Sequence, residues 1–223
     1  DTSKATDMSH MFNGAINFDQ SLNFDTNKVT DMTHMFYGAE NFNQPLNFTD
    51  TSNVTDMSHM FDGAAFFNQA LEFNGLPWDT GNVTDMSGMF QRARSFNQSL
   101  NFNTRFVNDM SFMFNKATSF NKPLNFDTIN VTDMSYMFNS ASSFNKSLNF
   151  SDTSNVTDMP RMFEKATNFN QPLEWDTGNV ENMSYMFHNA TSFNQHLDFN
   201  TSNVTNMNDM FTGATSFDKD LNW

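Results

Sequence analysis

The sequence predicts a single α/β repeat solenoid, and two observations lead to that prediction. The first is a fixed period, because one apolar position recurs at steps of 24 or 25 residues, with a single step of 29, and divides the 223 residues into nine units. The second is that residue types at most other positions repeat with the same period. A unit of this length cannot bury an apolar face alone, so neighbouring units are expected to stack. The period is marked by Ala5, Val29, Val54, Val83, Val107, Val131, Val156, Val180 and Val204.

The predicted core consists of ladders of identical side chains. All 18 methionines fall in two columns, one that begins at Met8 and one three residues later. Phenylalanine fills two further columns, which begin at Phe12 and Phe18, and leucine fills the column that begins at Leu22. Residues that recur at one period stack on copies of themselves, and methionine packs well against aromatic rings. We therefore expect a core of Met, Phe and Leu ladders.

Within one unit, the apolar spacing predicts a short helical turn followed by a short strand. In the sixth unit, the apolar residues between Val131 and Ala141 recur at the spacing of one helical face. Asp133 lies where a side-chain oxygen can cap the first turn. The segment Leu148–Phe150 then alternates between apolar and polar residues, as a strand does. Parallel strands on one face and helical turns on the other are the leucine-rich-repeat arrangement.

Three segments of the repeat carry a resemblance to a known family, namely Val54–Phe61 (VTDMSHMF), Ser119–Asn121 (SFN) and Asp152–Val156 (DTSNV). The repeat resembles the BspA-like leucine-rich-repeat surface proteins of bacteria, in the Met- and Phe-rich branch common in mycoplasma lipoproteins. The resemblance covers the whole chain. It implies extracellular display on the cell surface and adhesion-type binding, with the export signal and the anchor outside this segment.

Composition and charge exclude several classes of protein. The formal net charge is −14 and the pI is about 4.4, so we expect no nucleic-acid partner, because phosphate contacts need Lys and Arg. The chain has no cysteine, which excludes disulfides and thiolate metal sites. No apolar run is long enough for a signal peptide or a membrane span within these residues. Neither end carries a polar capping unit, so we expect residues 1–223 to be a fragment of a longer surface protein.

Polar columns are candidates for structural or metal-binding roles. The Asn or Asp that follows the second Phe, as at Asn121, is expected to bond the backbone amides of successive units. Two Asp columns, as at Asp127 and Asp133, would stack carboxylates that repel unless they accept hydrogen bonds or share cations. Calcium is one interpretation, but Asn replaces Asp in some units, which favours hydrogen bonding within turns. We therefore predict no metal and no cofactor. An unbroken Thr column, as at Thr128, is expected to bond the backbone of its turn.

Two candidate binding regions lie in the middle of the chain. Trp78 ends a five-residue insertion, and insertions in solenoids map to loops that often bind partners. The alternative is a harmless bulge whose Trp78 folds back onto the stack. Basic residues concentrate between residues 92 and 165, so Arg92, Arg94 and Arg105 are candidates for docking an acidic partner. The alternative is a solvated surface whose charge varies along the chain without a binding role.

One variable column supplies further candidates. It begins with three histidines, as at His34, and continues through Phe112, Tyr136 and Tyr185. Three stacked histidines could bind a metal, although second ligands are not evident. The aromatic residues could stack on sugars or on a peptide.

These features predict a cell-surface module for adhesion and not an enzyme. The sequence has no phosphate-binding Gly loop, no HExxH motif and no Cys nucleophile. The expected partner is a protein or glycan on the surface of a host or neighbouring cell. The competing hypothesis is a structural spacer that projects another domain from the cell, in one variant stiffened by calcium.

Overall fold

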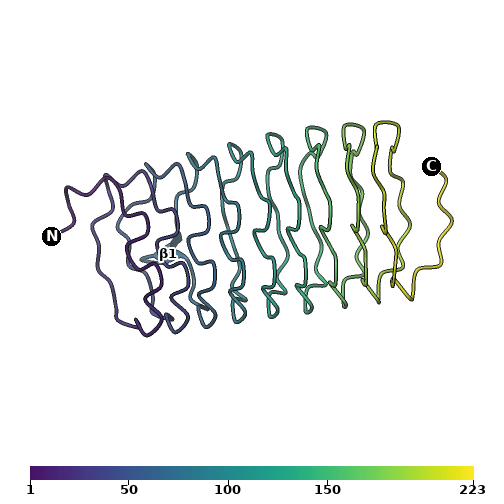
Figure 1. Ribbon diagram of the computed structural model, residues 1–223. Helices are drawn as coiled ribbons and strands as arrows, with labels where there is room; N and C mark the ends of the chain where they lie inside the picture. The colour runs from purple at the N-terminus through teal and green to yellow at the C-terminus, as the bar shows by residue number, and fades with distance from the viewer.

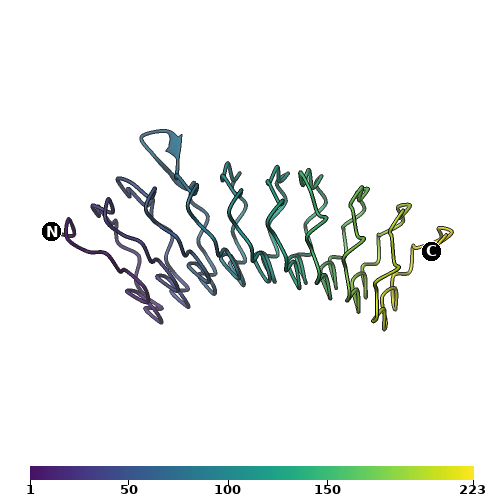
Figure 2. The same ribbon diagram turned by 90° about the horizontal axis from the view of Figure 1, so that it is seen from above.

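The computed structural model describes residues 1–223 as a row of coils, one for each sequence unit (Figure 1). Successive coils lie side by side along the whole chain, and the two termini lie at opposite ends of the row. Seen from above, the row is gently bowed (Figure 2). Backbone hydrogen bonds join matching segments of neighbouring coils, and the acceptor is often the residue just before the donor's equivalent, as from Phe114 to Met137 (2.9 Å) and from Phe138 to Met162 (2.9 Å).

The coils contain no helix, so the expected α/β arrangement of the leucine-rich-repeat type is wrong. The only strands are β1 (Glu72–Phe73) and β2 (Leu76–Pro77), which pair with each other as an antiparallel hairpin. Everywhere else the units meet through isolated parallel bridges of one residue each. Among the elements of this structure there is no helix that could cross a membrane.

The segment expected to be a helical turn is a series of β-turns. In the sixth unit, Tyr136 and Ser140 have φ angles of 58° and 59°, a left-handed conformation that interrupts a right-handed helix. The amide of Met137 donates to the carbonyl of Met134 (3.3 Å) with Tyr136 at the third position of that turn, whereas the amide of Met134 donates to Asp158 of the next unit (2.9 Å). Successive turns place apolar residues three or four apart, as a helix does, so the spacing alone could not distinguish them.

The expected strand at Leu148–Phe150 does not form either. The leucine column makes only two bridges, between Leu22 and Leu46 and between Leu124 and Leu148. An unbroken series of parallel bridges instead runs along the column from Asp7 to Asn206, at the start of each Met–Phe segment. The coils therefore pair where the sequence led us to expect the start of a helix.

The core does consist of the predicted ladders. Phe138 stacks on Phe144 of its own unit, with ring centroids 4.2 Å apart, and on Phe163 of the next unit at 5.6 Å with an interplanar angle of 3°. The same arrangement recurs along the row, and the internal Met and Phe side chains are fully buried. One continuous cluster of buried side chains runs from Met8 to Met210. The Met and Phe columns therefore hold the coils together.

The five-residue insertion forms the hairpin that projects beyond the neighbouring coils (Figure 2). Asn74 and Gly75 connect β1 to β2, with φ angles of 52° and 76°, as the two central residues of a type I′ turn require. Leu76 is exposed at the hairpin. The chain then returns to the row at Trp78, which is buried and stacks on Phe48 with ring centroids 5.3 Å apart.

Candidate functional site

The Asn column forms an internal ladder, which confirms the structural role expected for it. The side-chain oxygen of Asn121 accepts the backbone amide of Asn145 at 3.0 Å, and Asn145 in turn accepts the amide of Asn170 at 3.0 Å. Equivalent bonds join every pair of neighbouring units from Asp19 to Asp218. This column satisfies backbone amides and is not available to a ligand.

The Thr column bonds between units and not within its own turn. The hydroxyl of Thr80 donates to the carbonyl of Asn103 in the next unit at 3.0 Å, and Thr153 donates to Asp176 at 2.8 Å. These threonines are buried. The threonine side chains bond to the backbone as expected, but the carbonyl that accepts each bond lies in the next coil.

Both Asp columns accept backbone amides two residues later. Asp133 accepts the amide of Ser135 at 2.7 Å, and Asp152 accepts that of Ser154 at 2.8 Å. Burial raises the pKa of the Asp133 carboxyl, and the neighbouring carboxylates of the same column add to this effect and outweigh the bonds from Ser135. No group of three or more His, Asp or Glu side chains is placed to hold a metal ion. The hydrogen-bonding interpretation of these columns is confirmed by their contacts.

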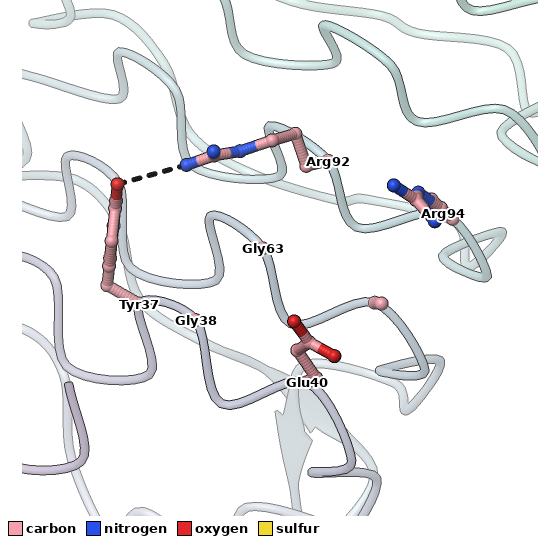
Figure 3. A pocket seen from close by; sticks show the side chains of 7 residues that line it. Tyr37, Gly38, Glu40, Gly63, Arg92 and Arg94 are labelled. Atoms are coloured by element: carbon pink, nitrogen blue, oxygen red, sulfur yellow. Dashed lines mark hydrogen bonds between the residues drawn. The ribbon is translucent and has the colours of Figure 1, made fainter. Parts of the chain in front are cut away.

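Two of the predicted arginines meet at one hollow, of about 240 Å³ (Figure 3). Its floor is formed by Gly38 and Gly63, at a position where later units carry longer side chains such as Lys116. The absence of side chains there leaves the space open. The residues that line the hollow are Tyr37, Gly38, Glu40, Gly63, Ala65, Arg92 and Arg94.

Arg92 is held in place by a buried carboxylate. The Nε of Arg92 donates to Asp62 at 2.8 Å, and Nη2 donates to the hydroxyl of Tyr37 at 3.1 Å. Asp62 is buried and also contacts His59 at 3.0 Å and Gln91 at 2.9 Å. The hydrogen bond that Arg92 donates to Asp62 raises the pKa of Arg92, so its guanidinium stays charged. Because Arg92 lies in the fourth unit and Tyr37 in the second, their contact spans the third unit and closes this side of the hollow.

Arg94 and Glu40 stand at the hollow without partners. Arg94 is exposed and its guanidinium forms no hydrogen bond or ion pair, and the same is true of the Glu40 carboxylate. Figure 3 shows both side chains at the rim, apart from Tyr37. Arg105 is exposed but does not line this hollow, so the structure does not bring all three predicted arginines together.

The predicted aromatic anchors are largely covered by one another. Phe112 stacks on Tyr136 with ring centroids 4.5 Å apart, and the guanidinium of Arg161 lies 5.7 Å from the Tyr136 ring and 4.0 Å from the Tyr185 ring. Both faces of Tyr136 are therefore occupied, and Phe112 and Tyr185 each have one face covered. Such a stack is a poor platform for a sugar, which needs a free ring face.

Two other predicted residues are also engaged within the molecule. Trp78 is buried against Phe48, as the alternative of a bulge that folds back onto the stack expects, and it is not exposed as a binding loop would have it. His34 stacks between His10 and His59, with ring centroids 4.8 Å from each. Face-to-face stacking does not make their nitrogens converge on one point, as a metal would require. Burial and the neighbouring histidines lower the pKa of His34.

Sequence reasoning missed Tyr37 and Glu40, which line the hollow, and Asp62, which holds Arg92 in place beside it. Tyr37, Asp62 and Glu40 lie in columns where most other units carry a different residue. This departure from the repeat was the available signal, but it could not show that Tyr37 and Arg92 lie close together across the third unit.

Comparison with known proteins identifies one family. The model described as "Mycoplasma protein of unknown function, DUF285" matches residues 1–76, 74–174 and 148–223. No curated protein matches the chain.

Proposed function

The chain belongs to DUF285, a family described as Mycoplasma protein of unknown function, and from that premise we propose that it is an adhesion module displayed on the bacterial cell surface. Its partner is an acidic surface protein of a host or neighbouring cell. The resemblance of the repeat to BspA-like surface proteins, including mycoplasma lipoproteins, supports this location. So does the solenoid-like row of coils, which presents a long surface for its mass.

The observation that carries the proposal is the hollow at Arg92 and Arg94. Arg92 is fixed by Asp62 and Tyr37, so little side-chain entropy is lost when a partner binds there. Arg94 has no internal partner, and a free guanidinium beside a hollow can receive a carboxylate. The Arg92–Asp62 pair and the Glu40 carboxylate balance the formal charge of the hollow, so the unpaired guanidinium of Arg94 is the group that attracts an acidic partner here, in a chain of net charge −14.

A spacer is the second candidate function, and the continuous ladders favour it. The Asn column and the Phe columns join every unit to the next, which gives a stiff, extended body without any ligand. A spacer needs only its length, whereas an adhesion module concentrates affinity in a few residues. The two functions therefore predict different effects of a single surface substitution.

The test is binding of the labelled module to intact cells, with Arg94→Glu compared against Lys146→Glu. Both changes reverse one exposed basic charge, but Lys146 lies outside the hollow. We expect Arg94→Glu to weaken binding at least about tenfold, Lys146→Glu to leave it within about twofold, and higher salt to weaken binding of the wild type. Equal binding by the two variants would contradict the role of the hollow. A wild-type module that binds no cell type would favour the spacer.

A further inference from the structure

A different surface of the coils is formed by the three-residue run around the phase-marking valine, which reads Asn-Val-Thr in five of the nine units. The valine lies inward and is fully buried, as at Val83 and Val107, so the residues before and after it point outward. The result is two exposed rows along the coils, one mainly of Asn and one mainly of Thr. Open hollows of about 640 Å³ and 530 Å³ lie over these rows, in units four to six and seven to nine.

The side chains of both rows are held in fixed orientations by the coils. The amide nitrogen of Asn82 donates to the carbonyl of Ser52 at 2.7 Å, and that of Asn130 donates to Arg105 at 2.7 Å. The hydroxyl of Thr84 donates to the preceding coil in the same way, at 3.2 Å. One N–H of each Asn amide and the Thr hydroxyl hydrogen are thus used internally, while the Asn side-chain oxygens accept no bond from the protein. Each row presents ordered acceptors that match a ligand rich in hydroxyl donors.

Phe106 interrupts the Asn row at the centre of the larger hollow. It takes the place that Asn82 and Asn130 hold in the neighbouring units, and 53% of it is exposed. No other ring stacks on it, in contrast to Phe112 and Tyr136. A free ring face between rows of acceptors has the two features that hold a sugar, because C–H groups pack on the negative face of the ring and hydroxyls bond to the acceptors.

We propose that this surface, the Asn/Thr face, binds a linear neutral polysaccharide laid along the coils across Phe106. The rows run in one direction over several units, which suits an extended chain. None of the residues that line the larger hollow is charged, and the net charge of −14 disfavours an anionic glycan. This site shares no residue with the arginine hollow, so it is a second function that does not depend on the proposed one.

The chain offers a matched pair of variants for the test. Phe106→Asn restores the residue that the repeat carries at this position in six other units. The control is Phe66→Asn, at an exposed Phe of another column, in which three other units carry Asn (Asn17, Asn41 and Asn168). Both variants remove one exposed ring of similar accessibility. Both are expected to fold, which unchanged melting curves would verify.

The measurement is retardation of the chain in native gels that contain a soluble neutral polysaccharide, with a β-glucan, an α-glucan and a galactan as probes. We expect at least one probe to retard the wild type and Phe66→Asn equally, and Phe106→Asn to bind it about 3- to 10-fold more weakly. Retardation that survives Phe106→Asn would overturn the proposal, as would no retardation by any probe. A protein ligand would overturn the proposal in another way. In that case Phe106→Asn would weaken binding of the chain to cells, and protease treatment of the cells would weaken binding of the wild type. The Arg94→Glu variant should be retarded like the wild type, so failure here and failure of the adhesion proposal remain distinguishable.

Discussion

At the residue scale, the stacking of coils changes the pKa of individual carboxyl groups. Asp133 lies between Asp109 and Asp158 of the neighbouring coils and is joined to both by parallel bridges. Burial raises its pKa above the ordinary value of 3.8, and the two neighbouring carboxylates raise it further. Asp152, in the other Asp column, has its pKa lowered by hydrogen bonds from Ser154. Asp133 and Asp152 are therefore expected to respond in opposite directions to pH and to neutralisation.

The first prediction is that Asp133→Asn stabilises the protein at pH 7, whereas Asp152→Asn does not. A raised pKa means that the folded state binds the proton more tightly, so the stability contributed by Asp133 is greatest below pH 3.8 and is lost as pH rises through the folded pKa. Asn182 already occupies the equivalent position and accepts the amide of Ser184. We expect a melting temperature about 1–3 °C higher for Asp133→Asn.

Repeating both melts at acidic pH supplies the control. The gain from Asp133→Asn should vanish near pH 3, because the wild-type carboxyl is then protonated. For Asp152 the sign is reversed, since a lowered pKa gives stability that is present above pH 3.8 and is lost as pH falls through the folded pKa. A lower melting temperature for Asp133→Asn at pH 7 would contradict the raised pKa.

The second prediction concerns the buried carboxylate beneath the arginine hollow. Arg92→Leu removes the 2.8 Å bond to Asp62 and leaves that buried group with His59 and Gln91. Loss of one bond to a buried charged acceptor should lower the free energy of unfolding by about 1–3 kcal/mol. Arg94→Leu is the matched control, because Arg94 has no internal partner, and it should leave the unfolding curve unchanged. Denaturant titration of both variants measures the difference, and equal curves would show that the Asp62 contact contributes nothing.

At the scale of the elements, turns with a left-handed residue replace the expected helix. Two positions in each of the nine units have positive φ, among them Ser140, and four units carry Gly at the same place. A non-Gly residue in this conformation costs about 1–2 kcal/mol. The row is thus built on strained turns that stacking stabilises.

The third prediction is that Ser140→Gly raises stability and that Ser140→Val lowers it. Glycine adopts φ near 59° without a Cβ clash, so up to about 1 kcal/mol of the strain should be recovered after its entropy cost. A β-branched side chain increases the strain. A helix would respond in the opposite sense, since glycine costs about 1 kcal/mol in a helix interior. Unfolding in urea therefore distinguishes turn from helix directly, with a loss for Ser140→Gly as the contradicting result.

The same turns explain which parts of the structure could be predicted from the sequence. The ladders of Phe138 and Asn121 follow from the period alone, because identical residues at one spacing must stack whatever the local backbone is. The backbone does not follow, since turns and helices share the three-to-four spacing and Tyr136 carries no sign of its positive φ. Arg92 and Arg94 stood out by residue type, but the contact of Arg92 with Tyr37 depends on the rise between coils. The sequence alone allowed Trp78 to be a loop residue or a buried one. The structure shows that the chain re-enters the stack after the hairpin, so that Trp78 packs on Phe48.

At the scale of the whole molecule, the ladders join each coil to its immediate neighbours, and the side-chain contact of Arg92 with Tyr37 across the third unit is an exception. Damage to one coil should therefore spread little. The Asn and Phe ladders join adjacent units, and no segment packs back across the row in either view (Figures 1 and 2). The stability of such a body is approximately a sum of unit and interface contributions. A defect in the sixth unit should therefore weaken the units beside it more than the first.

The fourth prediction is that Met134→Asp breaks the row locally. Met134 is fully buried, and an unpaired carboxylate there should cost about 3–5 kcal/mol or more. Hydrogen exchange should show lost protection at Met110 and Met159, whose amides lie in the adjoining coils, and retained protection at Met32, near the start of the row. Met134→Leu is the control, because it keeps the volume and should cost less than about 1.5 kcal/mol. Uniform loss of protection from Met32 to Met183 would mean that the coils unfold as one cooperative unit, and an unchanged exchange pattern would contradict the buried Met ladder itself.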